Sequence, residues 1–341
     1  MILLLVLYFV VVLVGVNANF KDTCDYLSIE NTQAIKGIFI LMVFYSHFNS
    51  YITEIGPYFD LYRTFFNLIG QAMVTLFLFY SGYGVMESIK RKGKGYISKF
   101  PKNRIFATLF KFDCAVILYL ALAFILGKNI TVKNVILSLI GWESVGNSNW
   151  YIFVILFLYL LTYIVFKLFS EKNNFIPVFA IGILLCAIIY LVNRYQIKET
   201  YWYDTALWYV MGMGYSLIKE HIEGLINKNN IIWLSSLGIL TCMYLFLHGH
   251  GTMSDMVANL VFAAAVVVFT MHITLKNKVL IWCGENLFEI YILQRIPMIV
   301  FKELGIGELN VYLYFVLCIL VTLLLSLVFS FTVNKIWKKI I

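Results

Sequence analysis

The feature that most constrains this chain is a series of continuous apolar blocks, each about 16 to 24 residues long. At about 1.5 Å of rise per residue, roughly 20 residues of helix cross a hydrocarbon core about 30 Å thick. A membrane β-barrel would instead show segments of about ten residues in which apolar and polar side chains alternate. The blocks therefore predict an all-α fold, a polytopic membrane helical bundle.

We expect membrane spans at 2–17, 37–53, 66–86, 105–126, 149–169, 176–193, 204–218, 230–248, 256–274, 280–301 and 310–333. The first span is interpreted as an extra N-terminal transmembrane helix within residues 1–18. The other spans form about ten core helices of one membrane domain, residues 31–333.

Composition excludes an ordinary soluble protein. The chain is 62% hydrophobic and 13% charged, against roughly 45–50% and about 25% in soluble domains. In a membrane protein, a net charge of +8 indicates how the chain is oriented in the membrane and that it contacts anionic lipids. No nucleic-acid partner is expected. The six cysteines form no CxxC pair, which predicts packing residues and no disulfide framework. We expect a multi-pass protein of the cell membrane.

Lysine and arginine counts predict the orientation. The segment 87–104 contains seven basic residues and is expected on the cytoplasmic side. Alternating the spans from there gives 17 basic residues in the cytoplasmic linkers and C-terminal tail and 6 outside. The N-terminus is then outside and uncleaved. The alternative is a signal peptide cut near Ala18, but the segment has no basic n-region, and cleavage would move 87–104 outside.

His47 is the sharpest candidate for chemistry. It follows Lys36 by eleven positions in one apolar block, about 16 Å along a helix axis and so near mid-membrane. Loss of hydration there favours the neutral imidazole, which can accept a proton from a hydroxyl. The alternative is a packed histidine that forms a hydrogen bond to a neighbouring helix.

Lys36, ten residues and His47 resemble the arginine, ten residues, histidine signature of the acyltransferase 3 family of integral membrane acyltransferases. Four further segments are similar to family motifs and follow in the family's order: FLFYSGYGV, FPKNRIFATLFKF, NWYIFVILFLY and GENLFEIYILQRIP. The resemblance spans about residues 31–333. It implies that Tyr83 and Trp150, which belong to the first and third of these motifs, bind substrate.

Three departures from the family pattern stand out. Lys36 occupies the place of an arginine, which keeps the charge but loses the bidentate fork. Gln294 occupies the place of the family's late histidine, so no acid–base role transfers to that position. Residues 2–17 precede the family's usual set of ten helices.

Two carboxylates fall at the expected depth of His47. Asp113 and Glu289 each lie about 13 Å into their spans, so either is a candidate to orient the imidazole in catalysis. The alternative is pairing among Lys111, Asp113, Glu289 and Arg295 that serves packing only. Arg295 is expected in the outer half of the membrane, where it can contact an acceptor.

The resemblance implies an acyl-CoA, most simply acetyl-CoA, as the donor substrate, with no permanently bound cofactor. Lys102 and Arg104, the basic residues of 87–104 nearest the membrane, are assigned with Lys36 to its phosphates. The alternative for this segment is an orientation anchor that contacts anionic lipid. His248 and His250 have no third ligand at helical spacing, so no metal site is expected.

The resemblance thus implies a membrane O-acyltransferase that modifies a cell-surface polysaccharide, another glycan or a lipid-linked sugar. Two rivals stay open. A transporter or flippase for a lipid-linked sugar would use the same buried charges, although the sequence shows no repeat with broken helices. An inactive membrane scaffold would be consistent with Lys36 and Gln294. Gly212 and Gly214 lie in an apolar block and predict close helix packing.

Overall fold

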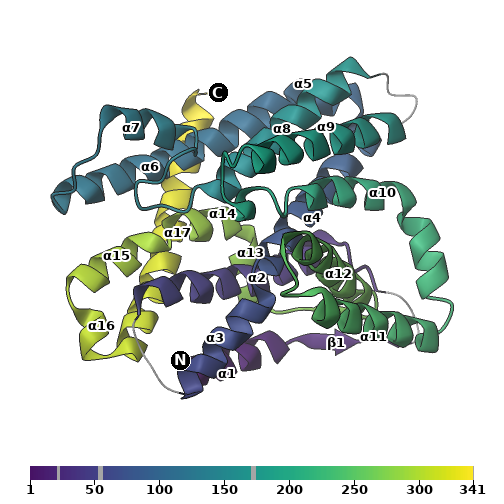
Figure 1. Ribbon diagram of the computed structural model, residues 1–341, viewed down its shortest axis with the longest axis horizontal. Helices are drawn as coiled ribbons and strands as arrows, with labels where there is room; N and C mark the ends of the chain where they lie inside the picture. Colours follow the sequence, from purple (N-terminus) through teal and green to yellow (C-terminus); the bar gives the residue numbers. More distant parts are fainter. Residues whose placement is uncertain (21–23, 53–56, 170–173, 341) are drawn as a thin grey trace.

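The computed structural model describes residues 1–20, 24–52, 57–169 and 174–340 (Figure 1). Its elements in chain order are α1 (Ile2–Leu13), β1 (Val16–Ala18), α2 (Ile29–Phe48), the 3-10 helix η1 (Asn49–Tyr51), α3 (Pro57–Ile69), α4 (Ala72–Lys92), α5 (Lys94–Phe100), the π-helical turn η2 (Pro101–Phe106), α6 (Ala107–Ile125), α7 (Val132–Leu139), α8 (Trp150–Leu168), α9 (Phe175–Arg194), the 3-10 helix η3 (Thr200–Trp202), α10 (Leu207–Ile226), α11 (Asn230–Leu247), α12 (Thr252–Thr270), β2 (Ile273–Leu275), α13 (Lys278–Glu285), α14 (Leu287–Leu293), α15 (Arg295–Glu303), α16 (Ile306–Leu309) and α17 (Val311–Ile340).

The predicted all-helical membrane fold is confirmed. Within the described residues, seven helical stretches are long and apolar enough to cross a membrane: Phe59–Lys92, Lys94–Ile125, Trp150–Leu168, Phe175–Arg194, Asn230–Leu247, Thr252–Thr270 and Val311–Ile340. The expected number of about ten core spans is not confirmed. Several of the other helices, α2 and α10 among them, include charged or polar residues within their length.

The expected linkers 54–65 and 87–104 contain helix. The described part of the first belongs to α3, which leads almost directly into α4. The second contains the end of α4, all of α5 and most of η2, with Gly93 at the break, where φ is +51°. Glycine accepts that backbone conformation without steric cost. Hydropathy marks only the apolar part of each helix. The helices continue past that part as polar turns, which hydropathy alone assigns to linkers.

The N-terminal segment forms a shorter helix than expected. Helix α1 has 12 residues, about 18 Å of rise, and the chain then continues as β1, which pairs antiparallel with β2. The helix is thus shorter than a hydrocarbon core is thick. That residues 1–18 cross the membrane stays a prediction.

The expected span 280–301 consists of three consecutive helices, α13, α14 and α15. The breaks fall at Asn286 and Gln294. The Asn286 side-chain amide donates to the Trp282 carbonyl at 2.9 Å, and such local side-chain bonds compete with regular helix. Helices α13 and α14 lie near the centre of the view beside α2, and α15 leads outward to the left (Figure 1).

Helix α2 is held against α13 by direct backbone contact. A Cβ atom added at Gly37 would lie 1.8 Å from the Leu280 carbonyl oxygen, and one added at Gly284 would lie 1.9 Å from the Gln33 carbonyl oxygen. No other residue fits at these two positions, because any side chain would force the helices apart. The two glycines therefore fix the position of α2, the helix that contains both Lys36 and His47.

Helices α4 and α10 pack in the same way. Gly82 approaches the Tyr209 carbonyl oxygen, and Gly212 approaches the Phe79 carbonyl oxygen, so that a Cβ at either glycine would lie within 2.0 Å of it. The packing role predicted for Gly212 is confirmed. At Gly214 a Cβ would meet nothing within 4 Å, so the same prediction for Gly214 is wrong. Gly214 faces open space.

Contacts between linkers divide the bundle into two ends. At one end β1 pairs with β2, and Lys90 contacts Ser216. At the other end Lys198 approaches Glu143 at 4.0 Å, and Arg295 contacts Ser148. Each contact joins linkers or span ends that the charge count assigns to one side of the membrane. We call the end with Lys36 and 87–104 the basic end, and the other the opposite end.

Candidate active site

A cavity of about 450 Å³ opens at the basic end of the bundle. Its walls come from α2, α4 and η2, and its residues include three of the predicted site residues, Lys36, Tyr83 and Arg104. The described residues that line it are Leu27, Ile29, Thr32, Gln33, Lys36, Tyr80, Tyr83, Gly84, Glu87, Ser88, Arg91 and Arg104. Three cations from three elements thus converge on one polar cavity.

Arg104 reaches the cavity from η2. Its Nε donates to the Tyr96 hydroxyl at 3.2 Å, which holds the guanidinium while leaving other N–H groups free to donate. Single π-helical turns within longer helices are frequent at functional sites. Lys102, two residues earlier, is exposed and does not line the cavity.

Arg91 is a cavity residue that the sequence analysis missed. It follows Gly84 by seven positions and Glu87 by four on α4, so these residues lie on one helix face. That spacing was available in the sequence. Which of the seven closely spaced basic residues face the cavity depends on how the helices, α4 among them, are rotated about their axes. The sequence does not specify that rotation.

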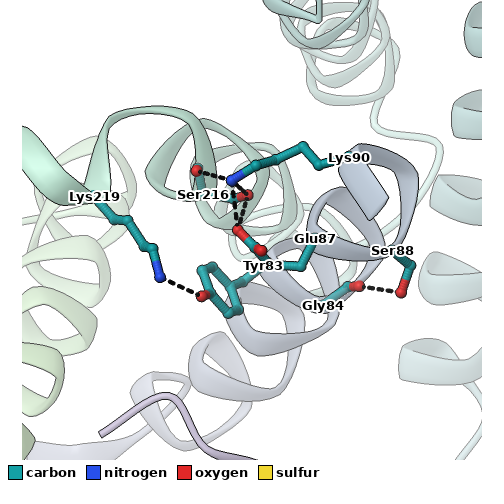
Figure 2. A network of polar contacts seen from close by, with 7 residues as sticks. All are labelled: Tyr83, Gly84, Glu87, Ser88, Lys90, Ser216 and Lys219. Atoms are coloured by element: carbon teal, nitrogen blue, oxygen red, sulfur yellow. Dashed lines mark hydrogen bonds and ion pairs between the residues drawn. The ribbon is translucent and has the colours of Figure 1, made fainter. Parts of the chain in front are cut away.

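Glu87, the one carboxylate among the described residues that line the cavity, is already engaged (Figure 2). Its Oε1 accepts from Lys90 Nζ at 2.8 Å and from Ser216 Oγ at 2.6 Å. Lys219 on α10 lies on the far side of Tyr83, with Nζ 3.5 Å from the Tyr83 hydroxyl (Figure 2). With Glu87 paired, the cavity keeps its positive character.

His47 lies at the other end of α2, in its last turn. The ring centroids of His47 and Tyr291 are 6.0 Å apart at an interplanar angle of 51°. His47 Nδ1 is buried and has no hydrogen-bond partner among the described residues. Counted along α2, the imidazole is eleven residues, or about 16 Å, from Lys36. His47 is the last but one residue of α2, and its depth in the membrane stays a prediction.

Arg295 and Trp150 lie in the same region. Arg295 Nε donates to Ser148 Oγ at 2.9 Å, and Ser148 is two residues before Trp150. The Trp150 ring contacts the Tyr201 ring at 5.8 Å between centroids. In sequence these groups come from four distant segments, and the fold assembles them at the opposite end of the bundle.

Comparison with known proteins adds the decisive observation. The family model described as an acyltransferase domain, Acyl_transf_3, matches residues 29–331, most of the chain. The chain belongs to the acyltransferase 3 family. Searches of curated proteins and of solved structures each found no match. The resemblance seen in the sequence is thus confirmed, and membership identifies the protein as a membrane acyltransferase.

The two predicted carboxylates of this acyltransferase do not meet His47. Glu289 Oε1 accepts from Lys111 Nζ at 2.8 Å, and the Glu289 side chain is almost fully buried. Asp113 Oδ1 is buried without a hydrogen-bond partner in the described structure. The expected hydrogen bond from the imidazole N–H to a carboxylate is therefore not formed. The alternative reading, interhelical pairing, describes Lys111 and Glu289.

Gln294, at the place of the family's late histidine, is fully buried. Its Nε2 donates to the Tyr291 carbonyl at 3.0 Å, so the side chain supports the helix break between α14 and α15. Within the described residues, no group of three or more His, Cys, Asp and Glu side chains is placed to hold a metal ion. His248 lies 3.7 Å from Asp255 at the opposite end.

Proposed function

We propose that this protein is an O-acetyltransferase of the cell membrane. In this proposal the acetyl group passes from acetyl-CoA to a hydroxyl of a cell-surface polysaccharide or other glycan. The observation that supports it best is the arrangement on α2, which contributes Lys36 to the basic cavity and presents His47 at its other end. One helix thus links an anion-binding cavity to a potential general base.

The donor phosphates would lie in the basic cavity. Lys36, Arg91 and Arg104 line it together, and hydrogen bonds from cations to phosphate are stronger than bonds between neutral groups. Glu87 is paired with Lys90 and so opposes an anionic ligand less than a free carboxylate would. The thioester would extend along α2 toward His47.

At His47 the proposed reaction is direct acyl transfer. The neutral imidazole takes the proton of the acceptor hydroxyl, and the hydroxyl oxygen forms a bond to the thioester carbonyl carbon. The carbon–sulfur bond then breaks, and CoA leaves as a thiolate that is protonated by the imidazolium or by water. Arg295, held by Ser148, and the Trp150 ring would position the acceptor through hydrogen bonds and ring contacts.

The test is transfer by purified protein. Wild-type protein in lipid nanodiscs should move a labelled acetyl group from acetyl-CoA to an extracted surface glycan, with a mass gain of one acetyl group. His47→Ala should remain folded and lose at least about 100-fold in rate, the usual minimum for a general base.

The matched control is His250→Ala, which replaces an exposed histidine outside α2 and should transfer normally. Undiminished transfer by folded His47→Ala would contradict the assignment, and movement of a lipid-linked sugar without acetylation would favour the transporter.

A further inference from the structure

Arg295 is a cation without a counter-ion in the described structure. It begins α15, directly after the helix break at Gln294, and its side chain is half-buried. None of the ion pairs within 4.0 Å in the described part of the chain includes Arg295. A guanidinium withdrawn from water in a membrane protein is costly unless an anion pairs with it. A bound anion would remove that cost.

The groups around Arg295 hold it without neutralising it. Its Nε–H donates to Ser148 Oγ at 2.9 Å, and Ser148 is buried. This bond leaves the N–H groups of both Nη atoms for other acceptors. Its charge acts on His47 and on four tyrosines, Tyr51, Tyr119, Tyr201 and Tyr291. Tyrosine hydroxyls are neutral at physiological pH, so they can orient the guanidinium but cannot balance its charge.

The loop before α8 adds a second unfilled donor. Asn147 is buried, and its Oδ1 accepts from the Val145 N–H at 3.0 Å, which fixes the orientation of the amide. Its Nδ2 is buried and has no hydrogen-bond partner among the described residues. The loop packs against α15, because a Cβ added at Gly146 would lie 3.4 Å from Ile299 Cδ1. One junction thus contains two kinds of donor, a guanidinium and an amide, that lack an acceptor.

We infer that Arg295 binds an anionic group of the acceptor, a carboxylate or a phosphate, so that the acceptor is an acidic glycan. Either group offers two oxygens that a guanidinium can contact at once. Arg295 follows Tyr291 by four residues, and the Tyr291 ring lies 6.0 Å from the His47 ring between centroids. An anion held at Arg295 would keep a neighbouring hydroxyl of the same glycan near the imidazole. The inference rests on the proposed function, since it names the acceptor of that reaction.

Binding of chemically treated glycans tests the inference without relying on transfer. Wild-type protein in lipid nanodiscs is immobilised, and binding of extracted surface glycan is measured by surface plasmon resonance. The glycan is used untreated, with its carboxyl groups reduced to alcohols, or with its phosphates removed. At least one treatment should weaken binding about tenfold to a hundredfold, as expected for the loss of charged hydrogen bonds, and it identifies the anion. Equal binding of all three forms, or binding of none, would overturn the inference.

A matched pair of variants assigns the effect to Arg295. Arg295→Gln should bind untreated glycan as weakly as wild type binds the treated form, and the treatment should no longer matter to it. Lys133→Gln removes an exposed cation of α7 at the same end of the bundle and should behave like wild type. If folded Arg295→Gln weakened binding of untreated and treated glycan equally, Arg295 would serve structure only and the inference would be wrong.

Glu54, which lies outside the described residues, has its own variant. Glu54→Gln should leave glycan binding unchanged, and a gain in affinity for untreated glycan would identify Glu54 as the partner of Arg295 and overturn the inference. The proposed reaction fails on different evidence. Binding that depends on the anion, without acetyl transfer, would contradict the proposed reaction alone, whereas equal binding and equal acetylation of all three glycan forms would contradict only this inference.

Discussion

Lys36 and Lys102 have the same charge but different surroundings, so we expect different effects on donor binding. Both were assigned to the donor phosphates, because each lies at the basic end of an apolar block. Lys36 is half-buried in the cavity wall, whereas Lys102 is exposed on η2 and lies outside the cavity lining. The sequence is enough to place both lysines at the basic end of the bundle. Whether each side chain faces the cavity depends on the rotation of its helix about the helix axis, which the sequence does not specify.

This difference leads to a paired kinetic prediction. Lys36→Gln removes one cation from the cavity and should raise KM for acetyl-CoA roughly tenfold to a hundredfold, since a charged hydrogen bond contributes about 1.5–3 kcal/mol. Lys36→Arg should preserve activity, because it restores charge and adds a bidentate fork. Lys102→Gln, the matched control, should leave KM unchanged. An equal rise in both glutamine variants would indicate a general effect of surface charge and remove Lys36 from the donor site.

Glu289 illustrates what depth along a helix cannot decide. Counting residues put Asp113, Glu289 and His47 at similar levels, but it gave no information on which way each side chain points. In the structure the α6–α14 contact directs Glu289 to Lys111. Breaking such a buried pair is costly, whereas replacing both partners with apolar groups is often neutral.

A double substitution therefore separates structure from catalysis at Glu289. Glu289→Leu leaves Lys111 without its partner and should destabilise the protein by about 3–5 kcal/mol. Adding Lys111→Met should restore thermal stability, measured by size-exclusion chromatography after heating. If Glu289 serves packing only, the double variant should also recover acyl transfer. A stable but inactive double variant would return Glu289 to the catalytic group.

At the scale of elements, the helices are arranged by backbone contact as much as by side-chain packing. Two helix pairs, α2 with α13 and α4 with α10, approach through glycines. Small residues permit such approaches in membranes, where no hydrophobic effect drives helices together. The sequence indicated this role for glycines of α10 in general, but not which face of the helix each one occupies.

Gly212 and Gly214 give the matching stability prediction. A Cβ at Gly212 would lie 2.0 Å from the Phe79 carbonyl oxygen, and a Cβ at Gly214 would meet nothing. Gly212→Ala must push α10 from α4 and should cost about 1–3 kcal/mol of stability. Gly214→Ala should be neutral or slightly stabilising, because alanine favours helix. Thermal unfolding in the same detergent measures both, and equal losses would contradict the close approach at Gly212.

The lengths of elements were less predictable than their type. Continuous apolar blocks identified most long helices, because a continuous apolar segment that crosses a bilayer must pair its backbone polar groups within itself, as a helix does. The same criterion missed the helical turns in 87–104, which are polar and hold Arg91 and Arg104. It also joined α13, α14 and α15 into one span, because the local hydrogen bond that breaks a helix at Asn286 leaves hydropathy unchanged.

At the scale of the whole molecule, the two ends of the bundle divide the proposed chemistry. The basic cavity lies at one end and the His47–Arg295 region at the other. The contacts that join linkers within each end agree with the alternation that the basic residues predict. If the basic end faces the cytoplasm, the donor site opens where CoA is available, and the acceptor region faces outward.

Cysteine labelling on intact cells tests this orientation. Gly95 is the better reporter in 87–104, because it is exposed and a Cβ there meets nothing, whereas Gly93 has a φ of +51° that disfavours any side chain. Cys24, the one native cysteine outside the predicted spans, is replaced by serine. An impermeant thiol reagent should label Gly95→Cys only after the cells are opened, and should label Asn129→Cys, exposed at the opposite end, without opening. The reverse pattern would place the basic cavity outside, beyond the reach of cytoplasmic acyl-CoA, because Arg91 and Arg104 of that cavity belong to the same segment as the reporter.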